Sequence, residues 1–165
     1  MTLSDLNDAD RDSARALVRP CLDVPRWVDA VVAGRPYATV EEAVRRARQV
    51  LEDDPLTPSE VEAALAHHPR IGDRARGSAR EAALSRGEQR GLDLTDAVQR
   101  ELRAANEAYE ARFDRVFLIR AAGRDVPEIL AECRRRTGND PHTEEREVAE
   151  QLAQIALLRL EGALS

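Results

Sequence analysis

Aromatic residues are scarce in this sequence. Phe, Tyr and Trp make up 3% of its 165 residues, whereas hydrophobic residues of all kinds make up 42%. A core with so few large rings has to be built from Ala, Leu, Val and Ile, which suits closely packed helices. A chain of this length can bury about 70% of its unfolded surface, so we expect one domain spanning residues 1–165.

Cysteine and the common metal-binding motifs are also nearly absent. The two cysteines, Cys21 and Cys133, lie far apart in the chain. A disulfide scaffold is therefore not expected, and the thiols indicate a reducing, cytoplasmic compartment. The sequence has no HExxH and no paired CxxC, and His142 is the only histidine outside the pair His67-His68. We therefore predict no metal site.

Long apolar runs and an excess of positive charge are missing as well. No apolar stretch approaches the roughly 20 residues that span a bilayer, and the acidic segment 1–10 shows no signal peptide. The net charge is -6, whereas proteins that bind nucleic acid through phosphate contacts are usually basic. We expect a soluble, cytoplasmic protein that binds neither membranes nor nucleic acid. A local group of arginines still permits a small anionic ligand: Arg70, Arg74, Arg76 and Arg80.

Helix-start signals recur along the chain. Three Ser/Thr-x-x-Glu sequences have the spacing of a capping box, in which hydroxyl and carboxylate each satisfy a backbone N–H group; they begin at Thr39, Thr57 and Ser78. Later helices are predicted to begin at the caps Asp93, Asp125 and Thr143, and the loop 137–141 is the strongest break. Other helices are expected near residues 4–19, 24–33, 40–52, 58–66, 79–90 and 126–136.

The segment from Leu94 onward has the most regular helical pattern. Apolar residues recur every three or four positions up to Phe113 and form one stripe. For the apolar run 116–119 a continued helix is favoured over a short strand, because no second strand-like segment exists to pair with it. The chain is therefore predicted to be all-α, a single compact domain of about seven to nine helices without a sheet.

His67-His68-Pro69 is the first sequence with possible chemistry. Pro69 lacks an N–H group and biases His68 away from helical geometry, so the helix that starts at Thr57 should stop here. A histidine at a helix C-terminus is favoured in its protonated form and can act as a general acid or base. From spacing alone, an ordinary histidine in a turn is the favoured interpretation.

Ser85-Arg86-Gly87-Glu88-Gln89 allows two interpretations. Ser85 and Glu88 again have capping-box spacing, which favours a simple helix cap. Ser85 also lies seven residues after Ser78, inside the helix that Ser78 should start. In a continuous helix, Ser85 and Glu88 would share a face and could point at one ligand.

Arg159 is notable for its position. Val148, Leu152 and Ile155 step along one face of the last helix, and the next step lands on Arg159. A charge on an apolar stripe costs free energy unless it is paired. Arg159 either extends past the core edge or pairs with a buried acid, or it lines a cleft and binds an anionic substrate.

Taken in order, these motifs resemble the family of 2-oxo-4-hydroxy-4-carboxy-5-ureidoimidazoline (OHCU) decarboxylases. The resemblance is most specific at His67-His68-Pro69-Arg70-Ile71-Gly72 and Ser85-x-x-Glu88-Gln89-x-Gly91, and it continues through Asn106-x-x-Tyr109, Arg136-x-x-Asn139-Asp140-Pro141 and Leu158-Arg159-Leu160. It implies an all-helical, commonly homodimeric carboxy-lyase without metal or organic cofactor, which acts on a small purine-degradation intermediate. The implied reaction gives (S)-allantoin in the last step of urate degradation.

The resemblance also assigns roles to individual residues. It makes His68 the acid or base, with Glu88 positioning or polarising that chemistry, and places Pro69 at the substrate. Substrate contacts are implied for the side chains of Ser85, Gln89 and Arg159 and for the backbone N–H groups of Leu118 and Ile119. The chain departs from the family at Asp114, where glycine is usual, and at Thr137. The first departure leaves an alternative open, a related helical enzyme or binding protein for another ureido or purine-like acid.

Overall fold

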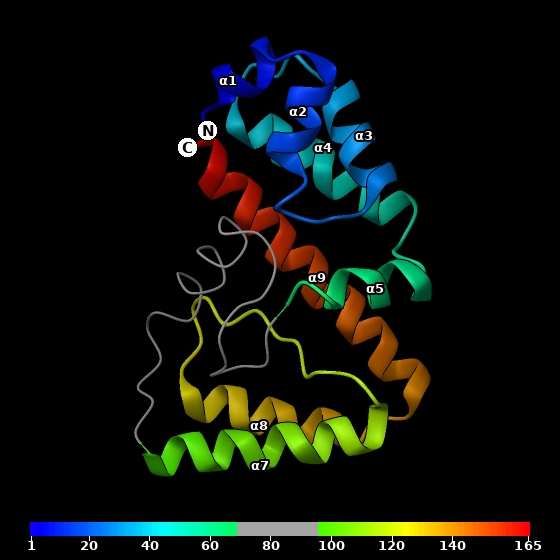
Figure 1. Cartoon of the computed structure of the whole chain (residues 1–165), viewed down its shortest axis with the longest axis vertical. Coiled ribbons are helices and arrows are strands. Elements are labelled where there is room, and N and C mark those ends of the chain that lie inside the picture. Colours follow the sequence, from blue (N-terminus) through cyan, green and yellow to red (C-terminus); the bar gives the residue numbers. More distant parts are fainter. Residues whose placement is uncertain (69–95) are drawn as a thin grey trace. The chain divides into compact units, whose positions relative to one another are not determined.

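The structure, a computed structural model, describes residues 1–68 and 96–165 (Figure 1). Within these ranges the chain forms eight helices and no strand, which confirms the all-α prediction. The helices are α1 (Leu3–Asp8), α2 (Arg11–Val18), α3 (Pro25–Ala33), α4 (Val40–Asp53), α5 (Pro58–Leu65), α7 (Asp96–Phe113), α8 (Val126–Thr137) and α9 (Pro141–Leu164). The helix expected near 79–90 and the caps Ser78 and Asp93 lie outside the described residues.

The chain divides into two compact units. Met1–Ala64 and Leu152–Ser165 form the first unit, and Leu65–Gln151 form the second. Helix α9 therefore supplies residues to both units. The expectation of one domain over residues 1–165 stays a prediction.

In the first unit, helix α3 packs against α2 and α4. The single tryptophan, Trp27, is fully buried on α3, and its indole Nε1 donates to the carbonyl oxygen of Ala47 on α4 across 3.0 Å. This hydrogen bond satisfies the only polar group of the ring, so the ring adds apolar area to the core without a desolvation cost.

The turn after α3 is closed by side chains. The hydroxyl of Tyr37 donates to the carbonyl oxygen of Val31 across 2.5 Å. A Cβ atom on Gly34 would lie 2.3 Å from that hydroxyl oxygen, so the turn requires glycine at this position. The guanidinium Nη1 of Arg35 donates to two carbonyl oxygens at the C-terminal end of α1, both across 2.7 Å. The turn thus fixes α1 against α3.

Two of the predicted helix starts in the first unit are confirmed. Thr57 and Glu60 form a complete capping box: the Glu60 N–H donates to the Thr57 hydroxyl across 3.2 Å, and the Thr57 N–H donates to the Glu60 carboxylate across 3.0 Å. At the start of α4, the Thr39 side chain accepts from the Glu42 N–H. Local hydrogen bonds readable from the sequence therefore define where these helices begin.

Two other predicted boundaries are wrong. The single helix expected over 4–19 is divided into α1 and α2, because the Asp10 carboxylate accepts from the Ser13 N–H across 2.9 Å and caps a new helix. Likewise α9 begins before the predicted cap Thr143. Asp140 accepts from the Thr143 N–H across 2.9 Å, so Asp140 is the cap and Pro141 takes the first helical position.

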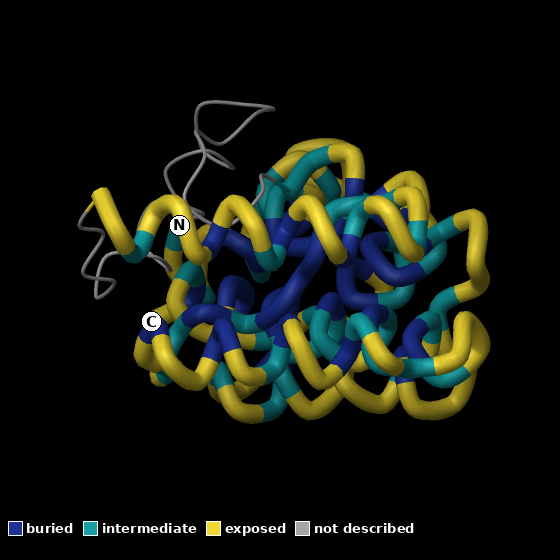
Figure 2. Tube along the Cα trace, turned by 90° about the horizontal axis from the view of Figure 1, so that it is seen from below, coloured by how far each residue is buried: buried dark blue, intermediate teal, exposed yellow. Residues whose placement is uncertain are grey.

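The second unit is built on helices α7 and α8, which pack side by side (Figure 1). Figure 2 shows each helix alternating between exposed and buried positions, as amphipathic helices do. Most core residues of this unit come from these two helices and the segment that joins them: Leu102, Tyr109, Phe117, Ile119, Ala121, Val126, Ile129, Leu130 and Cys133. The predicted cap Asp125 is confirmed, since it accepts from the Glu128 N–H across 2.9 Å.

The predicted helix over residues 116–119 is wrong. Helix α7 ends at Phe113, and residues 116–121 are neither helix nor strand. The change occurs at Asp114, whose φ of 55° is left-handed and cannot continue a right-handed helix. The apolar run is instead an irregular connection that is buried because its side chains fill the core.

Candidate active site

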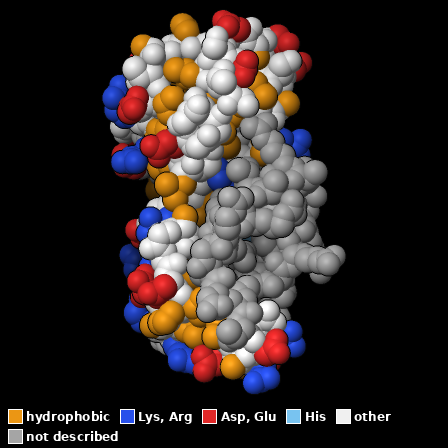
Figure 3. Space-filling view, turned by 90° about the vertical axis from the view of Figure 1, so that its left-hand side faces the viewer, with side chains coloured by type: hydrophobic (Ala, Val, Ile, Leu, Met, Phe, Trp, Pro, Cys, Tyr) orange, Lys and Arg blue, Asp and Glu red, His pale blue; other side chains and the backbone are white. Residues whose placement is uncertain are grey.

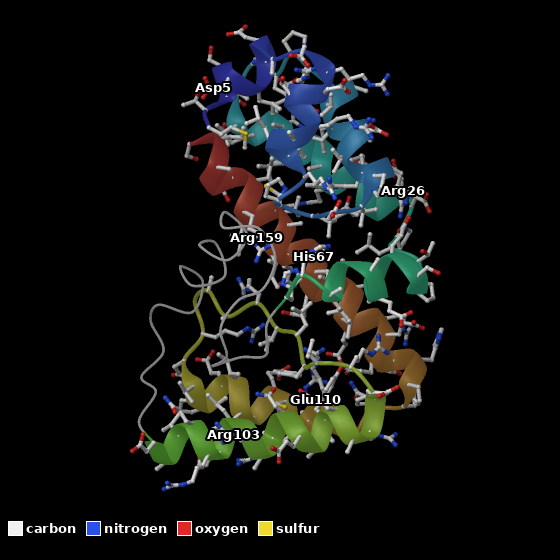
Figure 4. The ribbon with its side chains drawn as sticks, viewed as in Figure 1. Asp5, Arg26, His67, Arg103, Glu110 and Arg159 are labelled. Carbon is white, nitrogen blue, oxygen red and sulfur yellow. The ribbon has the colours of Figure 1, made fainter. Side chains whose placement is uncertain are left out.

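His68 lies directly after helix α5, as the proline that follows it predicts. The helix ends at Leu65, and the His68 N–H donates to the Leu65 carbonyl oxygen across 3.0 Å. His67 and His68 are both half-buried, and Figure 4 shows His67 beyond the end of α5. The C-terminal end of the helix, the negative end of its dipole, therefore lies within a turn of His68.

The segment that connects α7 to α8 contains Leu118 and Ile119, and both residues are buried. Leu118 and Ile119 are 4% and 3% exposed. The carbonyl oxygen of Leu118 accepts from Nη1 of Arg136 across 2.7 Å, and the N–H of Arg120 donates to Oε1 of Gln151 across 2.9 Å. Among the described residues we find no acceptor bonded to the N–H groups of Leu118 and Ile119. These are the two donors that the resemblance assigns to the substrate.

A buried ionic network lies behind this connection. Arg136 is 1% exposed and Glu144 is 0% exposed. Nη2 and Nε of Arg136 donate to Oε1 of Glu144 across 2.5 and 2.9 Å. The Tyr109 hydroxyl donates to the same oxygen across 2.6 Å, and the Asn139 amide donates to Oε2 across 3.1 Å. Because both charges are paired and hydrogen-bonded, the desolvation of this buried pair is largely offset.

Aromatic rings enclose the network. The Arg136 guanidinium carbon lies 4.7 Å from the ring centroid of Phe117 and 5.9 Å from that of Tyr109, within cation–π range. Burial raises the pKa of the Tyr109 hydroxyl, and its hydrogen bond to Glu144 raises this pKa further. Tyr109 is thus a neutral donor at physiological pH, which stabilises the carboxylate that holds Arg136.

Arg159 is buried on helix α9, as its position on the apolar stripe predicts. Leu152, Ile155 and Arg159 are 1%, 5% and 5% exposed. One guanidinium nitrogen of Arg159 lies 3.5 Å from the carbonyl oxygen of Pro20, at the limit of a hydrogen bond. Figure 4 shows Arg159 on α9, within the first unit. A planar cation therefore lies within the interior of the protein, not past its edge.

The expected site residues are divided between the described ranges and the rest of the chain. Pro69, Ser85, Glu88 and Gln89 lie outside the described residues. Of those described, His68, Leu118 and Ile119 belong to the second unit and Arg159 to the first. Leu118 and Ile119 are adjacent in the chain and both are buried in the second unit, and Arg159 is buried in the first.

The sequence interpretation gave no role to Arg136 and Glu144. The pattern that predicted a special position for Arg159 also applies to Arg136 and Glu144, because each is a charged residue on the apolar stripe of its helix. Ile129, Cys133 and Arg136 step by four and three along α8, and Glu144 lies four residues before the buried Val148 on α9. A charge at a core position of both helices predicts a buried pair.

The described ranges contain few other features of a site. A cavity of about 420 Å³ on the first unit is lined by none of the expected residues; its lining is Asp12, Arg15, Ala16, Arg19, Asp23, Pro25 and Val28. Across residues 1–68 and 96–165, no group of three His, Cys, Asp or Glu side chains could hold a metal ion. No helix in these ranges is long and apolar enough to cross a membrane. Acidic and basic side chains are interspersed on the face of each unit that Figure 3 shows.

Comparison with known proteins gives the class. The sequence profile of the OHCU decarboxylase family matches residues 7–161, almost the whole chain. The match defines an all-helical carboxy-lyase. The chain belongs to the OHCU decarboxylase family. No curated protein matches the sequence.

Two solved structures share the fold. One is an OHCU decarboxylase crystallised in the presence of (S)-allantoin; it has a TM-score of 0.65 and 22% identity, covering 86% of this chain and 92% of that one. The other is an (S)-allantoin synthase, with a TM-score of 0.69 and 17% identity; it covers 100% of this chain and 54% of that one. The chain thus spans about half of the second protein. At these identities the two structures support the fold.

Proposed function

We propose that this protein decarboxylates OHCU to (S)-allantoin, without a cofactor, as the last step of urate degradation. The observation that carries the proposal is the family match over residues 7–161. Three structural features are consistent with it: His68 follows the end of α5, Leu118 and Ile119 are buried in the connection between α7 and α8, and Arg159 is buried. Each of these groups suits one part of the reaction.

The reaction explains why side chains suffice. OHCU carries its carboxylate on a ring carbon next to an imine. When the carbon–carbon bond breaks and carbon dioxide leaves, the electron pair passes into the ring toward the imine nitrogen. A proton delivered to one face of the resulting planar ring then sets the configuration of allantoin. The protein has to fix the carboxylate, stabilise the delocalised negative charge and supply that proton.

His68 is the proposed proton donor and acceptor. Its position after α5 places it near the negative end of the helix dipole, which favours the charged imidazolium. A protonated imidazole can stabilise charge that develops on the ring and then transfer its proton. Glu88 is the proposed partner that orients His68 or polarises it, and Pro69 fixes the turn against the substrate.

The backbone N–H groups of Leu118 and Ile119 are proposed to bind the ring or ureido oxygens. Donors that are already fixed stabilise developing charge more effectively than donors that must reorient during the reaction. The Leu118 carbonyl is held by Arg136, and the next peptide group is held through the Arg120 N–H. The Ile119 N–H is therefore oriented before substrate arrives.

Arg159 is proposed to hold the anionic group of the substrate, with Ser85 and Gln89 hydrogen-bonding the remaining polar atoms. The guanidinium of Arg159 is buried and planar, a shape that matches a carboxylate. Replacing Arg159 with Lys keeps the charge but loses the paired geometry, so we expect kcat/KM to fall. Arg146→Lys, an exposed change on the same helix, is the control.

The histidine pair provides the sharpest test of the proposal. His68→Asn and His68→Ala should lower kcat for freshly generated OHCU by roughly 10²–10⁴-fold, with the helical circular dichroism spectrum retained. His67→Asn changes the neighbouring, equally half-buried histidine and should leave most of the rate. Full activity in both His68 variants would remove His68 from the mechanism.

Two further properties belong to the same proposal. The protein is expected to act in the cytoplasm, where the intermediates of urate degradation would reach it. It is also expected to form a homodimer, as the family commonly does. Sedimentation of the purified protein at micromolar concentration should give the mass of two chains; a single-chain mass would reject the dimer.

A further inference from the structure

We propose that Arg136 is a positioning residue of the active site, which aims the backbone N–H of Ile119 at the substrate. The inference rests on the proposed function, in which that N–H is a substrate donor. It concerns a side chain with no expected contact to substrate.

The peptide group between Leu118 and Ile119 links Arg136 to the N–H of Ile119. A trans peptide is planar, so its carbonyl and its N–H point in opposite directions. Arg136 donates to the Leu118 carbonyl oxygen across 2.7 Å. This hydrogen bond sets the orientation of the whole plane, and with it the direction of the Ile119 N–H.

The next peptide group is fixed as well. The N–H of Arg120 belongs to the peptide plane that follows Ile119, and it donates to Oε1 of Gln151 across 2.9 Å. Both planes flanking Ile119 are thus held by side chains from other helices, whereas the connection itself has no sheet or helix hydrogen bonds. The side chain of Ile119 lies in the core of the second unit and anchors the position between them.

The charge on Arg136 adds an electrostatic effect. A cation at the carbonyl oxygen polarises the peptide and makes its N–H a stronger donor, since linked hydrogen bonds reinforce one another. A neutral donor would satisfy the carbonyl at a lower desolvation cost. Instead the chain buries a guanidinium and pairs it with Glu144, whose carboxylate also accepts hydrogen bonds from Tyr109 and Asn139. The buried pair of Arg136 and Glu144 would thus strengthen the Ile119 N–H as a donor, in addition to stabilising the fold.

The test replaces the buried pair with apolar residues of similar size. Arg136→Met with Glu144→Leu removes both charges together, a change that often preserves stability, whereas removing one partner leaves an unpaired buried charge. We expect the helicity to be retained and the unfolding midpoint to fall, because the Tyr109 hydroxyl and the Leu118 carbonyl lose their partners; activity is therefore measured well below that midpoint. The value of kcat for OHCU should fall at least about tenfold, while the pH profile set by His68 keeps its shape.

A neighbouring pair provides the matched control. Arg135 and Glu132 lie on helix α8 and form an ion pair of 2.8 Å, but the pair is partly exposed and has no bond to the connection. Arg135→Met with Glu132→Leu changes the same residue types and should leave kcat within about twofold of the wild type, since exposed pairs contribute little. Equal losses of kcat in both double variants would contradict a positioning role.

The Arg136→Lys variant tests the positioning role of Arg136 even if the apolar double variant does not fold. Lysine keeps the charge and can reach the carboxylate, but it lacks the planar fork that bonds Glu144 and Leu118 together. We expect a folded protein whose kcat lies between those of the wild type and the double variant, with KM changed less than kcat. A folded Arg136→Lys protein with wild-type kcat would overturn the inference. Absence of OHCU turnover in the wild type would instead reject the proposed function.

Discussion

The N–H of Asp114 donates to the carbonyl oxygen of Glu110 across 2.8 Å and closes the last turn of helix α7. Asp114 itself has a φ of 55°, in the left-handed region that glycine adopts without steric cost. Glycine is the residue that the family resemblance leads us to expect at this position. Aspartate at this position therefore adopts the backbone conformation that glycine favours.

Replacing Asp114 is the first prediction. Asp114→Gly should raise the free energy of unfolding by up to about 1 kcal/mol, because the strain of a left-handed side-chain residue is relieved. Asp114→Val should lower it by about 1–2 kcal/mol, since a β-branched residue tolerates this region poorly. Urea unfolding followed by circular dichroism measures both changes. Equal stability of the two variants would show that this φ is not retained in solution.

The turn at Gly34 gives a second prediction. In Gly34→Ala the new methyl group would lie 2.3 Å from the hydroxyl oxygen of Tyr37, so stability should fall by about 1–3 kcal/mol. In a Tyr37→Phe background the clash is removed, and the same alanine substitution should cost less. A double-mutant cycle of unfolding free energies gives the coupling. Additive losses would contradict the contact.

The Glu60 carboxylate gives a pH-dependent prediction. It accepts from the guanidinium of Arg26 across 2.7 and 2.8 Å as well as from the Thr57 N–H. The hydrogen bond from Arg26 lowers the pKa of Glu60 below its ordinary 4.5. Since the folded pKa is the lower one, the contribution to stability is present above pH 4.5 and is lost as pH falls below it.

Glu60→Gln should therefore cost about 1 kcal/mol at pH 7 and progressively less as the pH falls below 4.5. Glu62→Gln, an exposed change in the same helix, serves as the control and should cost little at either pH. The measurement is the urea midpoint at pH 7 and in the acid range. A cost of Glu60→Gln that is the same at both values would contradict the ion pair.

Cys133 gives the corresponding prediction at alkaline pH. Burial raises the pKa of its thiol from 9.0 to about 11. Between these values the unfolded chain releases the proton and the folded chain retains it, so stability falls as pH rises. Cys133→Ala should show a smaller loss of unfolding free energy between pH 8.5 and 10 than the wild type. Parallel losses in the two proteins would show that the thiol ionises equally in both states.

Much of the fold was predictable because its signals are local. The capping box of Thr57 and Glu60 and the cap Asp125 involve groups three residues apart, so the sequence contains both partners. The division at Asp10 was missed because an aspartate inside an amphipathic pattern also fits an exposed helical position. The end of α7 was missed because the left-handed conformation of Asp114 is a property of the backbone, and aspartate only tolerates it.

For the candidate site, local patterns predicted the positions of single residues but not the contacts between distant ones. Pro69 indicated where α5 ends, and a step of four along α9 indicated that Arg159 is buried. The network of Arg136, Glu144 and Tyr109 joins positions up to 35 residues apart, and no local pattern pairs them. The roles of Ser85, Glu88 and Gln89 stay predictions, since these residues lie outside the described ranges.

The stereochemistry of product formation tests the central claim most directly. Purified protein is mixed with freshly generated OHCU, and the circular dichroism of the allantoin formed is followed over time. We predict loss of OHCU faster than its spontaneous decay and a product that is optically active as (S)-allantoin, with both effects largely lost in His68→Asn. Racemic allantoin, formed at the spontaneous rate in the presence of folded protein, would contradict the account.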